Sequence, residues 1–323
     1  MPLSIKKLMP IPLITAAIAS LCAISGAVMA TESQAPVAAA SADPRLHPGE
    51  VRVLDLDPKY YKEVVPGKVY MRHWFGTNVS VAMFRVLPGE GDAPRAALHS
   101  HGTEFAVQMK GNGTMFDEAG HAYPLREGDV MLVKAGVKHT GEFGKSENVV
   151  LSVVTPPRPE YPAEDGVAYF PGSGKPAAPQ APSLQGDQGP PVRILFNLNT
   201  IAEQMDTIIP GQLYFKHWHG ADVSVGAFRM VRNEKGHFPG QMNKHGEEVA
   251  LLAKGALNME IGGKPYHVAE GQVLMIPPYM PHVGTCETDE CMLISWFTPN
   301  RVSEWGPEGN QKPELRFLDT KKK

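Results

Sequence analysis

The chain has 323 residues, 42% of them hydrophobic and 20% charged, which is typical of a globular protein with room for two domains. Its net charge of −3 comes with no basic stripe, so nucleic acid is not an expected partner. The 32 glycines and 30 prolines favour many turns and therefore short strands.

Residues 1–30 predict a secretory signal peptide. Lys6 and Lys7 precede an apolar run, and small residues lead to Ala30, after which we expect cleavage. A membrane anchor is the alternative, although Pro, Ser and Gly residues make this run a poor span. We therefore expect a periplasmic or secreted protein with no membrane attachment after cleavage. Residues 31–48 are rich in Ala, Ser and Pro and predict a disordered leader.

A long internal repeat organises the rest of the chain. Residues 70–76 return 144 residues later at 214–220, with Tyr, His, Trp and Gly at the same places. After a one-residue deletion, His139 corresponds to His282. A period this long indicates a duplicated domain rather than a solenoid. We predict domains at residues 51–157 and 192–300, a linker at 158–191 and a C-terminal tail at 301–323.

Each copy consists of short apolar segments separated by turn residues. Examples in the first copy are residues 79–86, 105–109, 130–133 and 149–154. Short strands at this spacing predict an all-β sandwich or barrel.

The first copy carries a cluster of residue types that bind metals. His99 and His101 occupy alternate positions, so in an extended segment their side chains share a face. Glu104 follows a bend, and His139 belongs to a later strand. Three imidazoles and one carboxylate leave open positions on an octahedral ion, and this donor set suits one divalent transition metal: Fe, Mn, Cu, Ni or Zn. The alternative is that these histidines only pack or form hydrogen bonds.

The order of these residues resembles the two-part cupin signature. The pair of histidines and the glutamate are followed by Gly111, and the second part runs from Gly128 to His139. The resemblance extends over both copies, so the chain is similar to an exported bicupin. It implies two tandem all-β cupin barrels of the double-stranded β-helix, or jelly-roll-like, type. Two departures are a shortened gap before the glutamate and Lys134 in place of the usual proline, which the second copy keeps as Pro277.

The second copy has a degenerate form of this site. Asn243 stands in the place of His99, whereas His245, Glu248 and His282 are retained. An amide oxygen is a poor ligand for transition metals, so a second site would be weaker. Two histidines and one glutamate can still form a facial triad. A metal-free second barrel is the alternative.

Inward-facing positions also separate the copies. Strand alternation after the glutamate directs Gln108 inward in the first copy and Leu252 in the second. A polar Gln108 is suited to contact a substrate, whereas Leu252 is suited to fill a core. His219 replaces Phe75 in the repeat and is an alternative source for the missing ligand.

Two cysteines remain after loss of the signal peptide. Cys286 and Cys291 are close in sequence, and in an oxidising compartment we expect a disulfide that closes a short hairpin. Two free thiols are the alternative.

The resemblance implies a metal-dependent enzyme acting on a small oxygenated organic substrate. Dioxygenase chemistry is favoured, and lyase, decarboxylase and isomerase chemistry are alternatives on the same fold. The metal ligands would be His99, His101, Glu104 and His139, with catalytic roles expected for Glu104 and Gln108. A hypothesis from another class is a non-catalytic periplasmic protein that binds or senses a metal or small ligand. The expected partner is a small molecule, and the chain is expected to be a monomer or a homo-oligomer.

Overall fold

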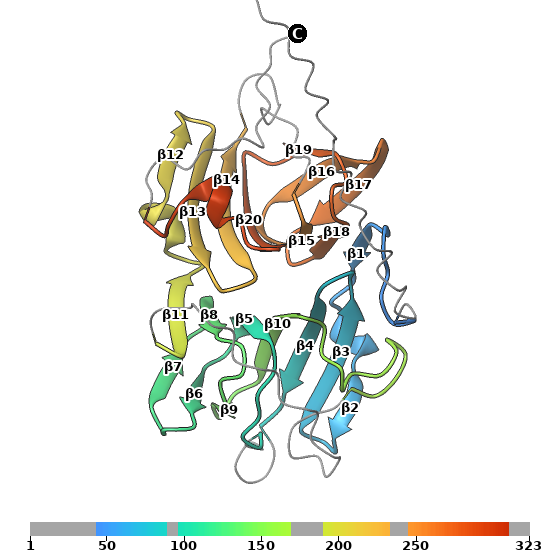
Figure 1. Cartoon of the computed structure of the whole chain (residues 1–323), viewed down its shortest axis with the longest axis vertical. Helices are drawn as coiled ribbons and strands as arrows, with labels where there is room; N and C mark the ends of the chain where they lie inside the picture. The colour runs from blue at the N-terminus through green and yellow to red at the C-terminus, as the bar shows by residue number, and fades with distance from the viewer. Residues whose placement is uncertain (1–42, 89–95, 169–189, 233–244, 310–323) are drawn as a thin grey trace, which may run out of the picture. The chain divides into compact units, whose positions relative to one another are not determined.

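The computed structural model describes residues 43–88, 96–168, 190–232 and 245–309 (Figure 1). The predicted signal peptide, most of the predicted leader and Asn243 lie outside these ranges, as do parts of the predicted linker and tail. No helix within the described ranges is long and apolar enough to cross a membrane. The regular secondary structure of the described residues is almost entirely β-strand, in two seven-stranded and two three-stranded sheets. The predicted all-β class is therefore confirmed.

The first barrel combines one seven-stranded sheet with one three-stranded sheet. The large sheet contains, in spatial order, β11 (Val192–Asn197), β8 (Asp129–Val133), β5 (Thr103–Lys110), β10 (Asn148–Thr155), β4 (Ser80–Val86), β3 (Val69–Phe75) and β2 (Lys62–Val65). The small sheet contains β7 (Ala122–Leu125), β6 (Gly113–Asp117) and β9 (His139–Phe143).

The second barrel repeats this plan. Its large sheet contains, in spatial order, β1 (Arg52–Leu54), β18 (Val273–Ile276), β15 (Glu247–Lys254), β20 (Glu290–Thr298), β14 (Ser224–Val231), β13 (Leu213–His219) and β12 (Asp206–Ile209). Its small sheet contains β17 (Lys264–Ala269), β16 (Ala256–Ile261) and β19 (His282–Cys286). The described helices are short: the 3-10 turns η1 (Pro58–Tyr60) and η2 (Ile201–Gln204), and α1 (Val302–Trp305).

The two repeats exchange their first strands. β1 belongs to the first repeat by sequence but pairs with β18, with Val53 opposite Leu274. β11 belongs to the second repeat but pairs with β8, with Ile194 opposite Met131. Each repeat therefore completes the large sheet of the other barrel. Domain boundaries drawn along the sequence do not show this exchange.

Strand β5 is buried on both faces. Phe105 and Val107 join a buried cluster that also includes Val249 and Leu251 of β15, so the large sheets of the two barrels share a core. The intervening residues face the interior of the first barrel. Burial on both faces explains why these strands read as nearly continuous apolar runs instead of alternating ones.

The structure joins Cys286 and Cys291 in a disulfide with a Cα–Cα distance of 5.9 Å. Cys286 ends β19 and Cys291 lies at the start of β20. The bond therefore closes the hairpin that follows the retained histidine of the second barrel.

Candidate metal centre

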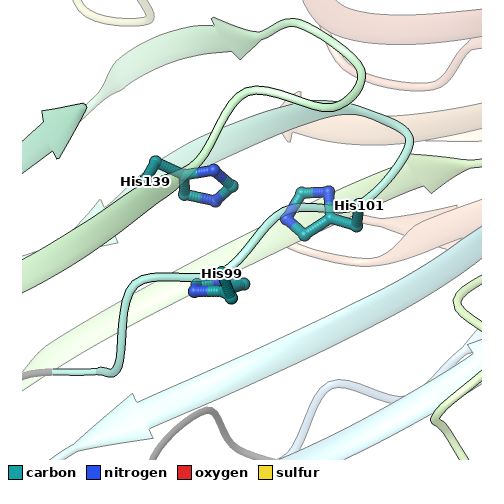
Figure 2. Close-up of side chains that lie close together, drawn as sticks. All are labelled: His99, His101 and His139. Carbon is teal, nitrogen blue, oxygen red and sulfur yellow. The ribbon is translucent and has the colours of Figure 1, made fainter. Parts of the chain in front are cut away.

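Two neighbouring segments position the predicted ligands of the first barrel. His99 and His139 form a β-bridge, in which each backbone N–H donates to the other residue's carbonyl at 3.1 and 2.9 Å. His101 lies two residues further along, and Glu104 is the second residue of β5. Figure 2 shows His99 and His101 on one segment with His139 facing them from the next. The bridge therefore fixes the spacing between the two halves of the site.

The four predicted ligands come together. Ring nitrogens of His99, His101 and His139 lie within 4.8 Å of one another. The Oε2 atom of Glu104 lies 3.2 Å from Nε2 of His101 and 3.5 Å from Nε2 of His139. The three histidine rings thus face one another, and the Glu104 carboxylate approaches two of them.

Backbone carbonyls set the tautomer of every imidazole in this group. A carbonyl oxygen only accepts, so the ring nitrogen that faces it must carry the proton. In each case this nitrogen is Nδ1, which leaves the Nε2 lone pair available to a metal. The acceptors, each at 2.9 Å, are Ala97 for His99, Gly102 for His101 and Val137 for His139.

Burial and charge place these groups in their metal-binding protonation states. Burial lowers the pKa of His99 well below its ordinary value and also lowers the pKa of His101. Burial pushes the pKa of Glu104 upward, but the neighbouring His101 and His139 outweigh this effect and hold it well below its usual range. Neutral imidazoles beside a carboxylate are the forms that ligate.

The donor set fits a divalent transition metal. Nε2 of His101 is buried and has no hydrogen-bond partner among the described residues. A buried polar atom left in this state costs free energy, which a metal would recover. Mixed nitrogen and oxygen ligands favour the transition metals over Mg²⁺ or Ca²⁺.

A cavity of about 80 Å³ adjoins this group inside the first barrel, with room for roughly six water-sized positions. His99, Glu104 and His139 line one part of it, and Gln108 and Ala106 line it along β5, as strand alternation predicts. Most of the remaining wall is apolar and comes from both sheets: Phe84, Ala96, Met115, Leu125, Met131, Phe143 and Val150.

The second barrel retains three ligands. Nε2 of His245 lies 3.2 Å from Nε2 of His282, and Oε2 of Glu248 lies 3.5 and 3.4 Å from these two atoms. The Nδ1 atoms donate to the carbonyls of Gly246 and Met280, each at 2.8 Å. Burial lowers the pKa of His245 to about 4, so this imidazole is neutral beside the Glu248 carboxylate. A bound cation would offset the cost of burying this carboxylate beside the nitrogen lone pairs.

His219 does not supply a further ligand. Its Nδ1 lies 2.7 Å from Oγ of Ser224, and its Nε2 lies 2.9 Å from the carbonyl oxygen of Gly306. Both ring nitrogens are therefore occupied away from the triad. The hypothesis that His219 replaces the missing imidazole is wrong.

Larger apolar side chains line the interior of the second barrel at two equivalent positions. The strand registers place Leu252 and Leu257 where the first barrel has Gln108 and Gly113. Both leucines are buried in the second barrel's own core cluster. The first barrel therefore provides the better-developed site.

Sequence reasoning missed two residues of the first site. Ser152 donates its hydroxyl hydrogen to Oε1 of Glu104, and buried Arg158 lines the cavity. Both have counterparts in the second copy, Ser295 and Arg301, at the same repeat spacing. The signal in the sequence was that these two polar residues recur at the same spacing in both copies.

Comparisons with known proteins agree with this architecture. Residues 82–155 match the model of the cupin domain family. No curated protein sequence matches the chain.

Three solved structures illustrate the similarity in fold. A cupin 2 conserved barrel domain protein from Leptotrichia buccalis has a TM-score of 0.51 at 13% identity, covering 76% of this chain and 96% of its own. Oxalate decarboxylase from Bacillus subtilis, described with Mn(II) centres, has a TM-score of 0.51 at 14% identity, covering 76% of both chains. Procruciferin, an 11S globulin from Brassica napus, has a TM-score of 0.53 at 14% identity, covering 78% of this chain and 85% of its own. The chain thus carries the cupin fold twice, and residues 82–155 match the cupin domain family.

Proposed function

We propose that the protein is a metal-dependent cupin enzyme that acts on a small oxygenated organic substrate in the periplasm. The observation that carries this proposal is the convergence of three Nε2 atoms and one carboxylate oxygen beside a cavity in the first barrel. Dioxygenase chemistry is the favoured class, and lyase, decarboxylase and isomerase chemistry would use the same residues.

The chain's own groups have distinct tasks in this proposal. His99, His101, Glu104 and His139 would hold the metal, which supplies Lewis-acid polarisation of a carbonyl or carboxylate and, if redox-active, one-electron chemistry. Ser152 holds Oε1 of Glu104 and so directs Oε2 toward the ligand nitrogens. The largely apolar wall of the cavity lowers the local dielectric and so strengthens the electrostatic interactions within it.

Three further observations support the proposal. The Mn(II) centres named for Bacillus subtilis oxalate decarboxylase show that a protein of similar fold holds a divalent metal, which is an analogy at the level of fold. The signal-like start of the sequence and the Cys286–Cys291 disulfide both favour an exported protein.

The test is metal analysis together with activity of the mature chain. We expect the mature chain to contain bound transition metal and to take up O₂ with some members of a panel of carboxylates and phenols. In His139→Ala, we expect the first barrel to lose its metal and the protein to lose this O₂ uptake. The control is His121→Ala, because that imidazole is largely exposed and pairs with Asp117 outside the cavity. Unchanged metal content in His139→Ala would contradict the site. Turnover without O₂ uptake would move the assignment to a lyase, decarboxylase or isomerase.

One observation favours a non-catalytic binding or sensor protein as the second candidate. Glu104 faces the other ligands, and both carboxylate oxygens of Asp129, another residue of the cavity wall, accept hydrogen bonds from Arg126 N–H and Asn197 Nδ2 at 2.7 and 2.8 Å. Both carboxylates are therefore already engaged, Glu104 with the neighbouring imidazoles and Asp129 in two hydrogen bonds. Metal binding without turnover of any panel member would favour this candidate.

A further inference from the structure

We propose that the first barrel binds a small monocarboxylate whose apolar body carries a hydrogen-bond donor, such as a hydroxyl group, at its far end. Arg158 would receive the carboxylate beside the metal group, and Gln108 would accept the hydrogen bond at the other end of the cavity. This inference rests on the proposed function for the location of the metal and adds the class of substrate.

Arg158 is held rigidly at the metal end of the cavity. It is 3% exposed and lines the cavity together with His99 and Glu104. Its Nε donates to Oε1 of Glu160 at 2.6 Å, and Nη2 contacts the same oxygen. The ring of Tyr161 lies 4.9 Å from its Cζ. One edge of the guanidinium is therefore occupied, and Nη1 remains for a ligand.

The charges at this end match a single negative charge on the ligand. Arg158 and a divalent metal together exceed the charges of Glu160 and Glu104 by one positive unit. A buried excess charge is costly unless a counterion enters with the metal. A monocarboxylate supplies that counterion, and its planar oxygens suit a guanidinium.

Gln108 lines the same cavity and carries an unsatisfied acceptor. Its Nε2 donates to the carbonyl of Lys110 at 2.7 Å and to Oδ1 of Asn148 at 2.8 Å, which fixes the orientation of the amide. Asn148 is itself fixed, because its Nδ2 donates to the carbonyl of Ser146 at 2.8 Å. Oε1 of Gln108 is buried and has no partner in the described part of the chain. Only a donor can satisfy this oxygen.

The two ends are separated along one strand. Glu104 and Gln108 lie four residues apart on the same face of β5, which places their Cα atoms about 13 Å apart. The wall between them is formed by apolar side chains, including Ala106, Met131 and Val150. An elongated ligand with polar ends and an apolar middle fits this pattern.

Asp129 argues against a dicarboxylate. It lines the cavity and neighbours Gln108, since Gln108 accepts from the N–H of Gly128 through its backbone carbonyl at 2.7 Å. A second carboxylate on the ligand would face this buried negative charge and would leave Oε1 of Gln108 without a donor. A hydroxyl group carries no charge that Asp129 would repel, and it can donate a hydrogen bond to Oε1 of Gln108.

The second barrel retains a buried arginine, Arg301, but lacks the glutamine. Leu252 replaces Gln108, and Cζ of Arg301 lies 5.1 and 5.3 Å from the rings of Phe297 and Trp305. The substitution Arg301→Gln therefore removes the equivalent buried arginine without changing the cavity of the first barrel, which makes it a matched control.

The experiment is calorimetric titration of the zinc-loaded full mature chain with 6-hydroxyhexanoate, hexanoate, adipate and hexan-1-ol, with metal content measured on the same samples. We expect 6-hydroxyhexanoate to bind most tightly, hexanoate more weakly, and adipate and hexan-1-ol at least tenfold more weakly than 6-hydroxyhexanoate. Arg158→Gln should weaken carboxylate binding at least tenfold, and Arg158→Lys should weaken it less. Gln108→Leu should abolish the preference for the hydroxyl group and leave hexanoate binding within about twofold.

The outcomes separate this inference from the proposed function. Loss of carboxylate binding in Arg158→Gln with metal retained supports it, provided that Arg301→Gln binds the probes normally and circular dichroism shows that Arg158→Gln is folded. Equal binding of carboxylates and alcohol, no binding of any probe to fully metallated protein, or unchanged binding in folded Arg158→Gln would overturn it. Absence of metal from the wild-type protein would instead contradict the proposed function.

Discussion

Ser152 of β10 donates its hydroxyl hydrogen to Oε1 of Glu104 across the sheet, and this contact orients the one carboxylate of the candidate metal centre. Because Oε1 is held in this way, Oε2 faces His101 and His139. Partners that orient a ligand in this manner contribute to metal affinity although they do not touch the metal.

Removing this hydroxyl should weaken the first metal site. We expect Ser152→Ala to lower metal affinity by about tenfold to a hundredfold, because Glu104 then loses its fixed orientation and a charge-assisted hydrogen bond. Competition with a chromophoric chelator measures this change. Ser295→Ala is the matched control, since Ser295 occupies the same position in the second barrel. Equal effects of the two substitutions on the tighter site would contradict the assignment.

The second barrel should bind metal more weakly than the first. It presents His245, Glu248 and His282, whereas the first barrel groups three imidazoles and also has Glu104 within 3.5 Å of two of them. We expect His282→Ala to remove only a weakly held equivalent of metal and to leave the tight equivalent unchanged. Stepwise extraction by a chelator, followed by elemental analysis, resolves the two. If His282→Ala removed the tightly held metal, the ranking of the two barrels would be reversed.

A substitution at Gly76 should disrupt a contact between the two barrels. The carboxylate of Glu247 accepts hydrogen bonds from the N–H groups of Thr77 and Asn78 at 2.6 and 2.5 Å, and a Cβ added at Gly76 would lie 1.9 Å from its Oε1. Gly76→Ala must displace this carboxylate and should lower the free energy of unfolding by about 2 kcal/mol. Urea denaturation gives the value.

A double-mutant cycle identifies the cause of that loss. Once Glu247→Ala has removed the carboxylate, Gly76→Ala should cost much less. Strictly additive effects would show that the clash with Glu247 is not responsible.

His219 should make stability depend on pH. Burial lowers the pKa of His219 to about 4, against about 6.5 in an unfolded chain. The unfolded state therefore binds more protons between these values, so the free energy of unfolding falls as the pH falls from about 6.5 toward 4. Between pH 7 and pH 5 this one group accounts for up to about 2 kcal/mol.

Phenylalanine occupies the equivalent position in the first barrel, as Phe75, so His219→Phe is the natural test. This variant should be less stable at pH 7, because it lacks the hydrogen bonds to Ser224 and Gly306. Its stability should nevertheless change less between pH 7 and pH 5 than that of the wild-type protein. Urea titrations at the two pH values measure it. An unchanged difference between the two pH values would refute a role for His219.

Much of the candidate site was predictable because its ligands follow local rules. Alternation in an extended segment pairs His99 with His101, and the duplication supplied an internal comparison in which Asn243 marks the weaker copy. Strand alternation likewise predicted that Gln108 faces the interior. Each of these inferences needed only a few neighbouring residues or the repeat itself.

Arg158 could not be placed in the same way. It follows the last strand of the first repeat, and nothing in its own neighbourhood shows that it reaches the cavity beside Glu104 and His99. Its position depends on long-range contacts, among them the hydrogen bond from its N–H to Oγ of Ser80 at 3.1 Å. Contacts between distant residues leave no periodic signature in a sequence.

The sequence by itself determined the all-β class, the duplication and the identity of the candidate ligands, because side-chain alternation and repeat spacing are properties of the chain alone. Tertiary structure decided that β1 and β11 complete each other's barrels and that Arg158 and Gln108 face one cavity. The physical reason is that strand pairing satisfies backbone hydrogen bonds with any suitable edge nearby in space, so the choice of partner depends on how the whole chain packs.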